Sequence, residues 1–219
     1  MIPTLSRPAL INSLQSRLIN QGLPGEQAHS MMAHAVRKVD PNPDVLTTRN
    51  AAVLIVLYEK NPGDFHLIFI RRTSTHDGDK HSGQIAFPGG KQEMSDPDLM
   101  YTALREAHEE IALDMSQIDI LGPITSLYIT VSKFLVHPFL AYSHTVPVLL
   151  RQESEIEEVL ELPLNAFMVP EAKQQTRIRL ATGIILNHVP CFQINGTIIW
   201  GATAMIMNEV LQLVQEAGY

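Results

Sequence analysis

Cysteine, basic charge and long apolar runs are all scarce in this chain, and each scarcity excludes a class of protein. The 219 residues contain one cysteine, Cys191, which excludes an internal disulfide and a cysteine-built zinc site. Sixteen lysines and arginines against 23 acids give a formal charge of −7, unlike the basic face of nucleic-acid or membrane-surface binders. No apolar run approaches the ~18 residues that span a membrane. We therefore expect a soluble, cytoplasmic protein with neither a nucleic-acid nor a membrane partner.

The first 44 residues are predicted to form an N-terminal helical extension with a linker. Apolar side chains at helical spacing indicate an amphipathic helix over Pro8–Gln21. A second helix is predicted over Glu26–Val39, after the breaker Gly22–Gly25, and Asp40–Asp44 (DPNPD) is the expected linker. The same N-terminus carries arginines and serines but no acid before Glu26, a pattern shared by organellar transit peptides, so organellar targeting is an alternative.

Residues 45–219 show the pattern of a mixed α/β domain. Ala51–Tyr58 and Phe65–Arg72 are apolar runs joined by a turn at Asn61–Asp64, which predicts a β-hairpin. Their nearly continuous apolar character indicates strands covered on both faces. Two or three more strands are expected up to Ser143, then a strand in GTIIWG and a closing helix over Ala202–Ala217. Strands interleaved with helices predict a layered α/β fold.

One predicted helix concentrates negative charge beside an apolar stripe. At about 100° per residue, Glu106, Glu109 and Glu110 fall within one narrow arc of it. The expected apolar stripe consists of Met100, Leu104, Ala107 and Ile111. Like charges at these spacings repel, and a hard divalent cation removes that repulsion. A solvated charged face is the alternative interpretation of such a cluster.

The residues around this helix favour a binding site over a solvated face. The preceding Phe87–Gly90 (FPGG) lets the backbone approach a ligand or its own helix closely. Arg105 is placed where it can orient Glu106 or Glu109 through a charged hydrogen bond. Glycine turn, arginine and clustered acids together favour a cation site over a solvated face.

This segment resembles the Nudix box, G-x5-E-x7-R-E-U-x-E-E-x-G-U with U aliphatic. The match over Arg105–Glu110 (REAHEE) is complete in the residues that bind metal in the family. Asp96 stands where the pattern has its first glutamate, and the interval from there to Arg105 is one residue longer than usual. Ala112 replaces the last glycine, a small-for-small exchange. Neither departure removes the predicted metal site.

Flanking motifs resemble the coenzyme A pyrophosphatase branch of that family. They are HSGQIAFPGG before the box, SEIEEVLELPL after it and IIWGATA near the end. The branch's upstream arginine motif is matched by Arg72 and by the spacing of Gly83 and Phe87, whereas Asp79 stands where a second arginine is expected and Lys80 is its potential replacement. The resemblance implies substrate contacts from Arg72, Lys80, His81, Gly83, Phe87, Gly89 and Gly90.

The resemblance implies a Nudix-type α/β/α sandwich with a mixed sheet, and hydrolysis of a nucleotide diphosphate with Mg²⁺ or Mn²⁺. Glu106, Glu109 and Glu110 are the implied metal ligands, with Arg105 orienting them. The general base is either a box glutamate or Glu155, with Glu157 and Glu158 behind it. Coenzyme A or acyl-coenzyme A, split into 3′,5′-ADP and a phosphopantetheine, is the expected substrate. The alternatives are a pyrophosphatase for ADP-ribose or dinucleotides, and a non-catalytic nucleotide-binding module; a homodimer is also expected as an option.

Overall fold

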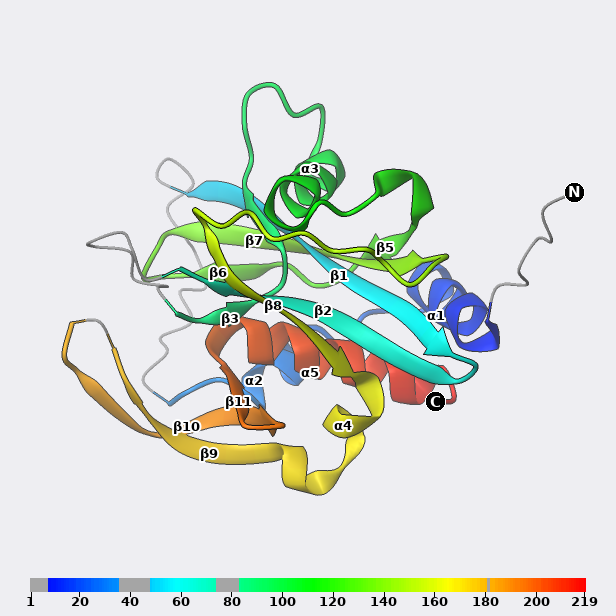
Figure 1. The fold of residues 1–219 in the computed structure, drawn as a ribbon. Helices are drawn as coiled ribbons and strands as arrows, with labels where there is room; N and C mark the ends of the chain where they lie inside the picture. Colours follow the sequence, from blue (N-terminus) through cyan, green and yellow to red (C-terminus); the bar gives the residue numbers. More distant parts are fainter. Residues whose placement is uncertain (1–7, 36–47, 74–82, 181) are drawn as a thin grey trace, which may run out of the picture.

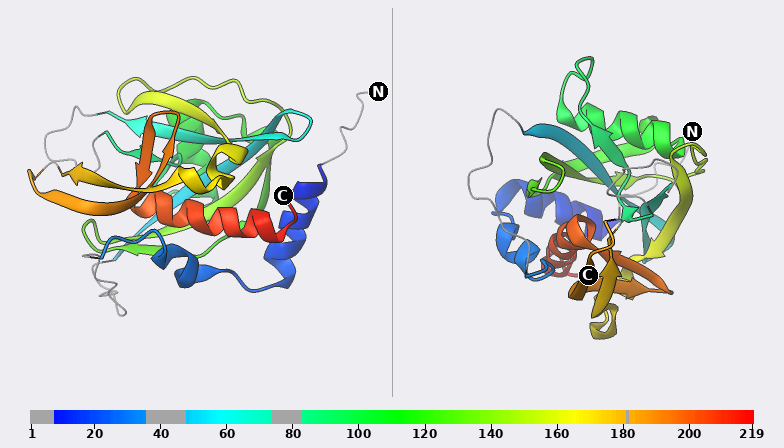
Figure 2. Two further views of the ribbon diagram at one scale, coloured as in Figure 1. Left: turned by 90° about the horizontal axis from the view of Figure 1, so that it is seen from below. Right: turned by 90° about the vertical axis from the view of Figure 1, so that its left-hand side faces the viewer.

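The protein is a layered α/β structure in which one mixed sheet separates two groups of helices (Figure 1). The computed structural model describes residues 8–35, 48–73, 83–180 and 182–219. Helix α3 covers one face of the sheet, and α1, α2 and α5 lie on the other (Figure 2). Within the described residues, no helix is long and apolar enough to cross a membrane.

The helices and strands follow one another in an alternating order. They are α1 (Ala9–Asn20), α2 (Gly25–Ser30), β1 (Arg49–Asn61), β2 (Asp64–Arg72), β3 (Ile85–Ala86), β4 (Gly89–Lys91), α3 (Leu99–Ile111), the 3₁₀ turn η1 (Met115–Gln117), β5 (Ile118–Pro123), β6 (Leu127–Ile129), β7 (Phe134–Ser143), β8 (Ile156–Pro163), α4 (Leu164–Met168), the 3₁₀ turn η2 (Pro170–Ala172), β9 (Lys173–Arg179), β10 (Ile185–Ile194), β11 (Thr197–Trp200) and α5 (Gly201–Glu216).

The main sheet is mixed because β1 pairs parallel with β7 and antiparallel with β2. Its central order is β3-β2-β1-β7-β5, with β4 on β1, β6 on β7 and β8 on β2. A second, three-stranded antiparallel sheet has the order β11-β10-β9. Its strands β10 and β11 contact α5, and β11 also contacts β3 at the edge of the main sheet (Figure 1).

Period-two alternation in β1 and β2 fills a core on each face of the main sheet. Ile55, Leu57, Leu67 and Phe69 belong to the core that includes α5, whereas Leu54, Val56, Ile68 and Ile70 pack with Ala103, Ala107 and Ile111 of α3. The predicted hairpin, covered on both faces, is confirmed. Because both faces are buried, polar residues of β1 and β2 are confined to their ends.

Strands β1 and β2 separate at one end, and the predicted glycine turn lies between them. The two strands pair only near their connecting turn, from Leu57↔Leu67 to Asn61↔Asp64. Farther along, β3 pairs with Ile70 and Arg71 of β2, and β4 pairs with residues 51–53 of β1. Leu54 N donates to Pro88 O at 2.8 Å in this gap. The backbone of 87–90 is thereby fixed beneath α3.

The second predicted helix is shorter than expected. Helix α2 ends at Ser30, and residues 36–39 of the predicted range lie outside the described residues. The Ala28 carbonyl, which would accept from Met32 in a continuing helix, accepts instead from the Asn208 side chain at 2.7 Å. Met32 N turns to His29 O, three residues back. A tertiary hydrogen bond therefore replaces the next helical one.

The other expected helices and the strands up to Ser143 are confirmed, with ends within a few residues. The prediction omitted β8, β9 and β10, so the second sheet was missed. Strand β9 has a mostly exposed, polar sequence with no apolar alternation, which explains why sequence periodicity did not detect it. The expected linker and domain boundary near residue 44 lie outside the described residues, and that division stays a prediction.

Candidate active site

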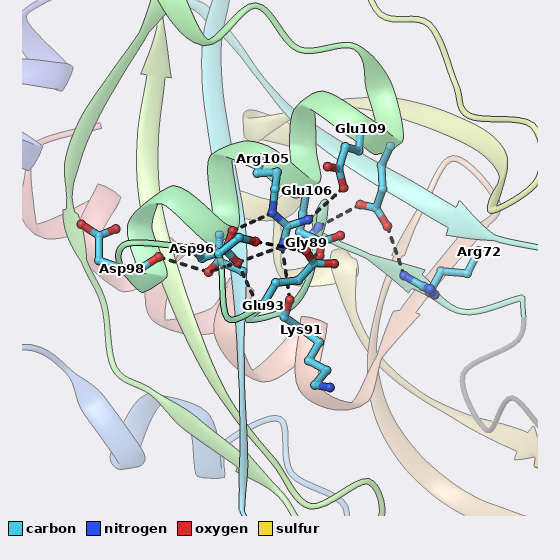
Figure 3. Close-up of polar contacts among 12 residues, drawn as sticks. Arg72, Gly89, Lys91, Glu93, Asp96, Asp98, Arg105, Glu106 and Glu109 are labelled. Carbon is cyan, nitrogen blue, oxygen red and sulfur yellow. Dashed lines mark hydrogen bonds and ion pairs between the residues drawn. The ribbon is translucent and has the colours of Figure 1, made fainter.

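Arg105 lies at the centre of the site and is held by Asp96 through a two-point charged contact (Figure 3). Its Nε donates to Oδ1 of Asp96 at 2.8 Å and its Nη2 donates to Oδ2 at 2.9 Å. An aspartate side chain is one methylene shorter than a glutamate, and here the loop to Arg105 is one residue longer than in the family pattern. The carboxylate still reaches the guanidinium, so the departure leaves the contact intact.

Asp96 is itself fixed by the loop and helix around it. Its side chain is fully buried and also accepts from Glu93 N and from Thr102 Oγ1, both at 2.9 Å. The hydrogen bonds from Arg105 hold the pKa of Asp96 well below its usual range, against the opposing effect of burial. The same pair raises the pKa of Arg105. The predicted catalytic set omits Asp96, although its position six residues after Gly90 was the available signal.

Arg105 also contacts two of the predicted metal ligands. Its Nη1 lies 2.8 Å from Oε2 of Glu109, one helical turn on, and its Nη2 lies 3.0 Å from Oε1 of Glu106. A further donation reaches Lys91 O at 3.3 Å. One guanidinium therefore connects the loop acid, strand β4 and helix α3, in the orienting geometry expected for it.

Glu106 packs directly against the glycine turn. A Cβ atom on Gly90 would lie 2.6 Å from Oε1 of Glu106, so a side chain there would occupy the space of the carboxylate. The side chain of Glu106 is 17% exposed, and burial raises its pKa despite the neighbouring Arg105. Close approach of β4 to its own helix, one of the two roles expected for this turn, is what the structure shows at Gly90.

Glu110 is the most buried acid of the cluster. It is 2% exposed, and its Oε2 accepts from Gly89 N at 2.8 Å while Oε1 accepts from Arg72 Nη1 at 3.1 Å. Burial raises its pKa to about 7, although both donors oppose the rise. Glu109, by contrast, is 56% exposed. The three glutamates thus share one face of α3 but differ widely in their access to solvent.

The apolar stripe predicted for α3 is partly wrong. The helix buries Thr102, Ala103, Ala107, Glu110 and Ile111, whereas Met100 is 39% exposed and Leu104 only half-buried. The docking face is therefore rotated toward the glutamates. Small residues at 103 and 107 let α3 approach the sheet closely, and that rotation brings the Glu110 carboxylate to Gly89.

Glu155 lies beside the cluster without touching it through a described hydrogen bond. It precedes β8 and is exposed, and its carbonyl accepts from Thr73 N at 2.9 Å. Its charge contributes, as a minor cause, to the raised pKa of Glu106 and of Glu110. Its fallback Glu158 instead pairs with Arg71 at 3.0 Å. Glu155 is thus the loop acid with an electrostatic effect on the box glutamates.

The predicted substrate contacts divide into three groups. Arg72 and Gly89 already contact Glu110, and Gly83 adopts a left-handed backbone, φ 70°, with its N–H donating to Arg72 O. Phe87 is 2% exposed and stacks on Phe69 with ring centroids 4.8 Å apart, so its ring belongs to the core. Lys80 and His81 lie outside the described residues. These substrate roles stay predictions.

The donor set suits a hard divalent cation. Clustered carboxylate oxygens with raised pKa values, one of them nearly excluded from solvent, are the oxygen ligands that Mg²⁺ and Mn²⁺ prefer. In the present side-chain positions, no three His, Cys, Asp or Glu groups of the described residues converge closely enough to hold an ion. Arg105 and Arg72 neutralise the glutamates instead. In donor chemistry, the carboxylates of Glu106, Glu109 and Glu110 fit such a cation.

The fold and site define a class: a mixed α/β domain with an arginine-anchored glutamate helix over a glycine turn. Residues 48–181 match the family model described as the NUDIX domain. The chain belongs to the Nudix family, as the sequence motif indicated.

Curated relatives agree with this assignment. Nudix hydrolase 15, mitochondrial, from Arabidopsis thaliana is 32% identical over 83% of this chain and 64% of its own length. The mitochondrial coenzyme A diphosphatase of Homo sapiens is 33% identical over 78% of this chain and 71% of its length. The uncharacterized Nudix hydrolase NudL of Yersinia enterocolitica is 33% identical over 76% of this chain and 82% of its own length. The chain spans between 56% and 64% of the length of three curated relatives that it matches.

Proposed function

We propose that this protein is a metal-dependent pyrophosphohydrolase that splits coenzyme A or acyl-coenzyme A into 3′,5′-ADP and (acyl-)4′-phosphopantetheine. The observation that carries the reaction class is that Glu106 and Glu110 pack against the glycines of β4 while Arg105 contacts both Glu106 and Glu109. Crowded and partly buried carboxylates have a cost when they lack cations. Retention of all three glutamates together with the arginine favours catalysis over a nucleotide-binding module.

In the proposed reaction, the carboxylates of Glu106, Glu109 and Glu110 would hold Mg²⁺ or Mn²⁺. The bound cation would neutralise the diphosphate and lower the pKa of the attacking water. Arg105, fixed by Asp96, keeps Glu106 and Glu109 on the substrate side of α3. Phe87–Gly90 fixes the floor of the site through its backbone hydrogen bonds.

Water forms a new bond to one phosphorus while the bond from that phosphorus to the bridging oxygen breaks. The departing phosphate keeps the bridging oxygen and its electron pair, so both products are phosphate monoesters. A carboxylate accepts the proton from water. Glu155 is our first candidate for this base because its charge acts on Glu106 and Glu110 from an exposed position; a box glutamate is the alternative.

Two features support coenzyme A as the substrate. The human relative at 33% identity is named a coenzyme A diphosphatase. Arg72, the matched arginine of the branch motif, lies at the site with its side chain 32% exposed, where it can reach a phosphate. ADP-ribose and dinucleotides share the diphosphate, and they are the competitors to test. The homodimer and the cytoplasmic location stay predictions. Light scattering, which measures the molar mass in solution, tests the homodimer.

The test is a panel of coenzyme A, acetyl-coenzyme A, ADP-ribose, NADH and diadenosine polyphosphates, ranked by kcat/KM with Mg²⁺ and with Mn²⁺. We expect coenzyme A or its acyl derivative to lead, with loss of activity in chelator. If ADP-ribose or a dinucleotide leads by tenfold, about 1.4 kcal/mol in transition-state binding, the substrate proposal is wrong and the reaction class stands. Absence of hydrolysis of every compound would contradict the reaction class itself.

A further inference from the structure

Arg72 has a fixed backbone and a side chain that can move. It ends β2, where Gly83 N donates to its carbonyl at 3.1 Å and its own N–H donates to Gln84 O at 3.3 Å. On the other edge it pairs with Ile156, and Thr73 N bonds to Glu155 O. Its side chain is 32% exposed, and its one described side-chain partner is Glu110. The guanidinium can therefore leave Glu110 without disturbing the sheet.

Glu110 cannot move in the same way. Its side chain is 2% exposed on the sheet-facing side of α3, and Gly89 N holds its Oε2 at 2.8 Å. Only Oε1 contacts a movable partner, Arg72 Nη1 at 3.1 Å. A buried carboxylate needs a cation or a proton, because leaving it unpaired is strongly unfavourable. Whatever replaces Arg72 at Oε1 must therefore be positively charged.

We propose that Arg72 is a displaceable counter-ion that couples cation binding at Glu110 to recognition of the substrate's phosphates. Arg72 neutralises Glu110 before the cation binds; when a divalent cation binds Oε1 of Glu110, Arg72 is released and binds an anionic oxygen of the nucleotide. This inference rests on the proposed function and adds an order of events to it. The residues that carry it are Arg72, Glu110 and Gly89.

Elementary electrostatics supports the exchange. Two cations that share one carboxylate oxygen repel each other, so a divalent ion and the guanidinium compete for Oε1. A guanidinium released at the mouth of the site finds its best remaining partner in a phosphate, which it binds through two parallel hydrogen bonds. Arg72 thus opposes the cation in the absence of nucleotide and assists the nucleotide once the cation is bound. By linkage, each ligand then strengthens the binding of the other through this side chain.

The neighbouring arginine provides a matched control. Arg71 precedes Arg72 on the same strand, is similarly exposed at 30%, and pairs with the solvent-facing Glu158 at 3.0 Å. Arg71→Gln removes the same charge from the same strand but leaves Glu110 and its partner in place. Arg72→Lys keeps the positive charge but cannot form the two parallel hydrogen bonds of a guanidinium. It therefore shows whether phosphate binding needs those two hydrogen bonds or only the charge.

The first measurement titrates the nucleotide-free protein with Mn²⁺ in a buffer above neutral pH and follows free Mn²⁺ by electron paramagnetic resonance. We expect Arg72→Gln to bind Mn²⁺ about tenfold more tightly than wild type, and Arg71→Gln to match wild type. Unchanged or weaker Mn²⁺ binding in Arg72→Gln, with a native circular dichroism spectrum, overturns the inference. Equal tightening by Arg71→Gln also overturns it, because the effect would then be general charge.

The second measurement follows binding of 3′,5′-ADP by calorimetry with and without saturating Mn²⁺. With Mn²⁺, Arg72→Gln should bind 3′,5′-ADP about tenfold more weakly than wild type, and without Mn²⁺ the two should agree. If Arg72→Gln and wild type bind 3′,5′-ADP equally well both with and without Mn²⁺, the inference is overturned. Neither titration requires turnover, so failure of coenzyme A hydrolysis contradicts the proposed function separately. If wild type binds no Mn²⁺ at all, both proposals fail.

Discussion

Replacement of Asp96 by asparagine tests whether the loop acid fixes Arg105. The variant keeps the shape of the side chain but places an amide where both Arg105 Nε and Nη2 donate, at 2.8 and 2.9 Å. Breaking one partner of a buried ion pair costs ~3–5 kcal/mol. Because Glu106 and Glu109 still neutralise Arg105, we expect the lower value, about 3 kcal/mol. For a chain of this length that loss lowers Tm by roughly 6–12 °C.

A nearby acid separates this effect from helix capping. Asp98 is the N-cap of α3 and accepts from Tyr101 N at 2.7 Å, but it makes no described contact with Arg105. Asp98→Ala should cost about 1 kcal/mol, or roughly 2–4 °C, and leave kcat near wild type. Asp96→Asn should also lower kcat by roughly 10- to 100-fold, because Arg105 no longer holds Glu106 and Glu109 in place. The assays are thermal unfolding by circular dichroism and steady-state kinetics.

The pH dependence of the stability loss follows from the direction of the pKa shift. The pKa of Asp96 is lowered in the folded protein, so its contribution is complete above the unfolded value of about 3.9 and is lost as the pH falls below it. The Tm difference between wild type and Asp96→Asn should therefore stay constant from about pH 8 to pH 5 and close in stronger acid. A Tm within about 2 °C of wild type at neutral pH would refute the reasoning.

Three further substitutions test other contacts. Glu109→Gln should lower kcat by on the order of a hundredfold or more with an unchanged Tm, since the side chain is 56% exposed; wild-type turnover would remove Glu109 from the metal site. Gly90→Ala should weaken Mn²⁺ binding at least tenfold, because its Cβ would lie 2.6 Å from Oε1 of Glu106; calorimetric titration that shows wild-type affinity would contradict this. Glu209→Gln should cost about 3 kcal/mol, because the buried Glu209 accepts from His29 at 2.8 Å and Thr125 at 2.6 Å; urea unfolding measures it, and a loss under 1 kcal/mol would refute a structural role.

The sequence predicted the elements whose pattern is local. The β1–β2 hairpin, α3 and α5 each have an apolar periodicity and clear boundaries, and all three are confirmed. Helix α2 was predicted too long because its end depends on Asn208, about 180 residues away in the chain. Strands β8, β9 and β10 were also missed, and β9 in particular has little to bury. Long-range hydrogen bonds and weak amphipathicity are invisible to local periodicity.

At the site, spacing predicted which residues share a face but not what each one contacts. The arc of Glu106, Glu109 and Glu110 follows from helical geometry, and so does the reach of Arg105 to Glu109. The burial of Glu110 depends on the rotation of α3 against the sheet, which Ala103 and Ala107 permit. The contact from Arg72 depends on the separation of β1 and β2. Both are tertiary features, and no motif spacing contains them.

The charge balance of the site supports the proposal that a divalent cation binds there. Five carboxylates, on Asp96, Glu106, Glu109, Glu110 and Glu155, face two guanidiniums, on Arg72 and Arg105, among the described residues of the site. Asp96 takes the strongest share of Arg105, which leaves the box glutamates under-neutralised. Burial is the main cause of the raised pKa values of Glu106 and Glu110, and repulsion from the neighbouring glutamates adds to it. In the complex that we propose, a divalent cation would supply two positive charges to these carboxylates and would free Arg72 for the substrate, so the repulsion among the carboxylates would favour cation binding.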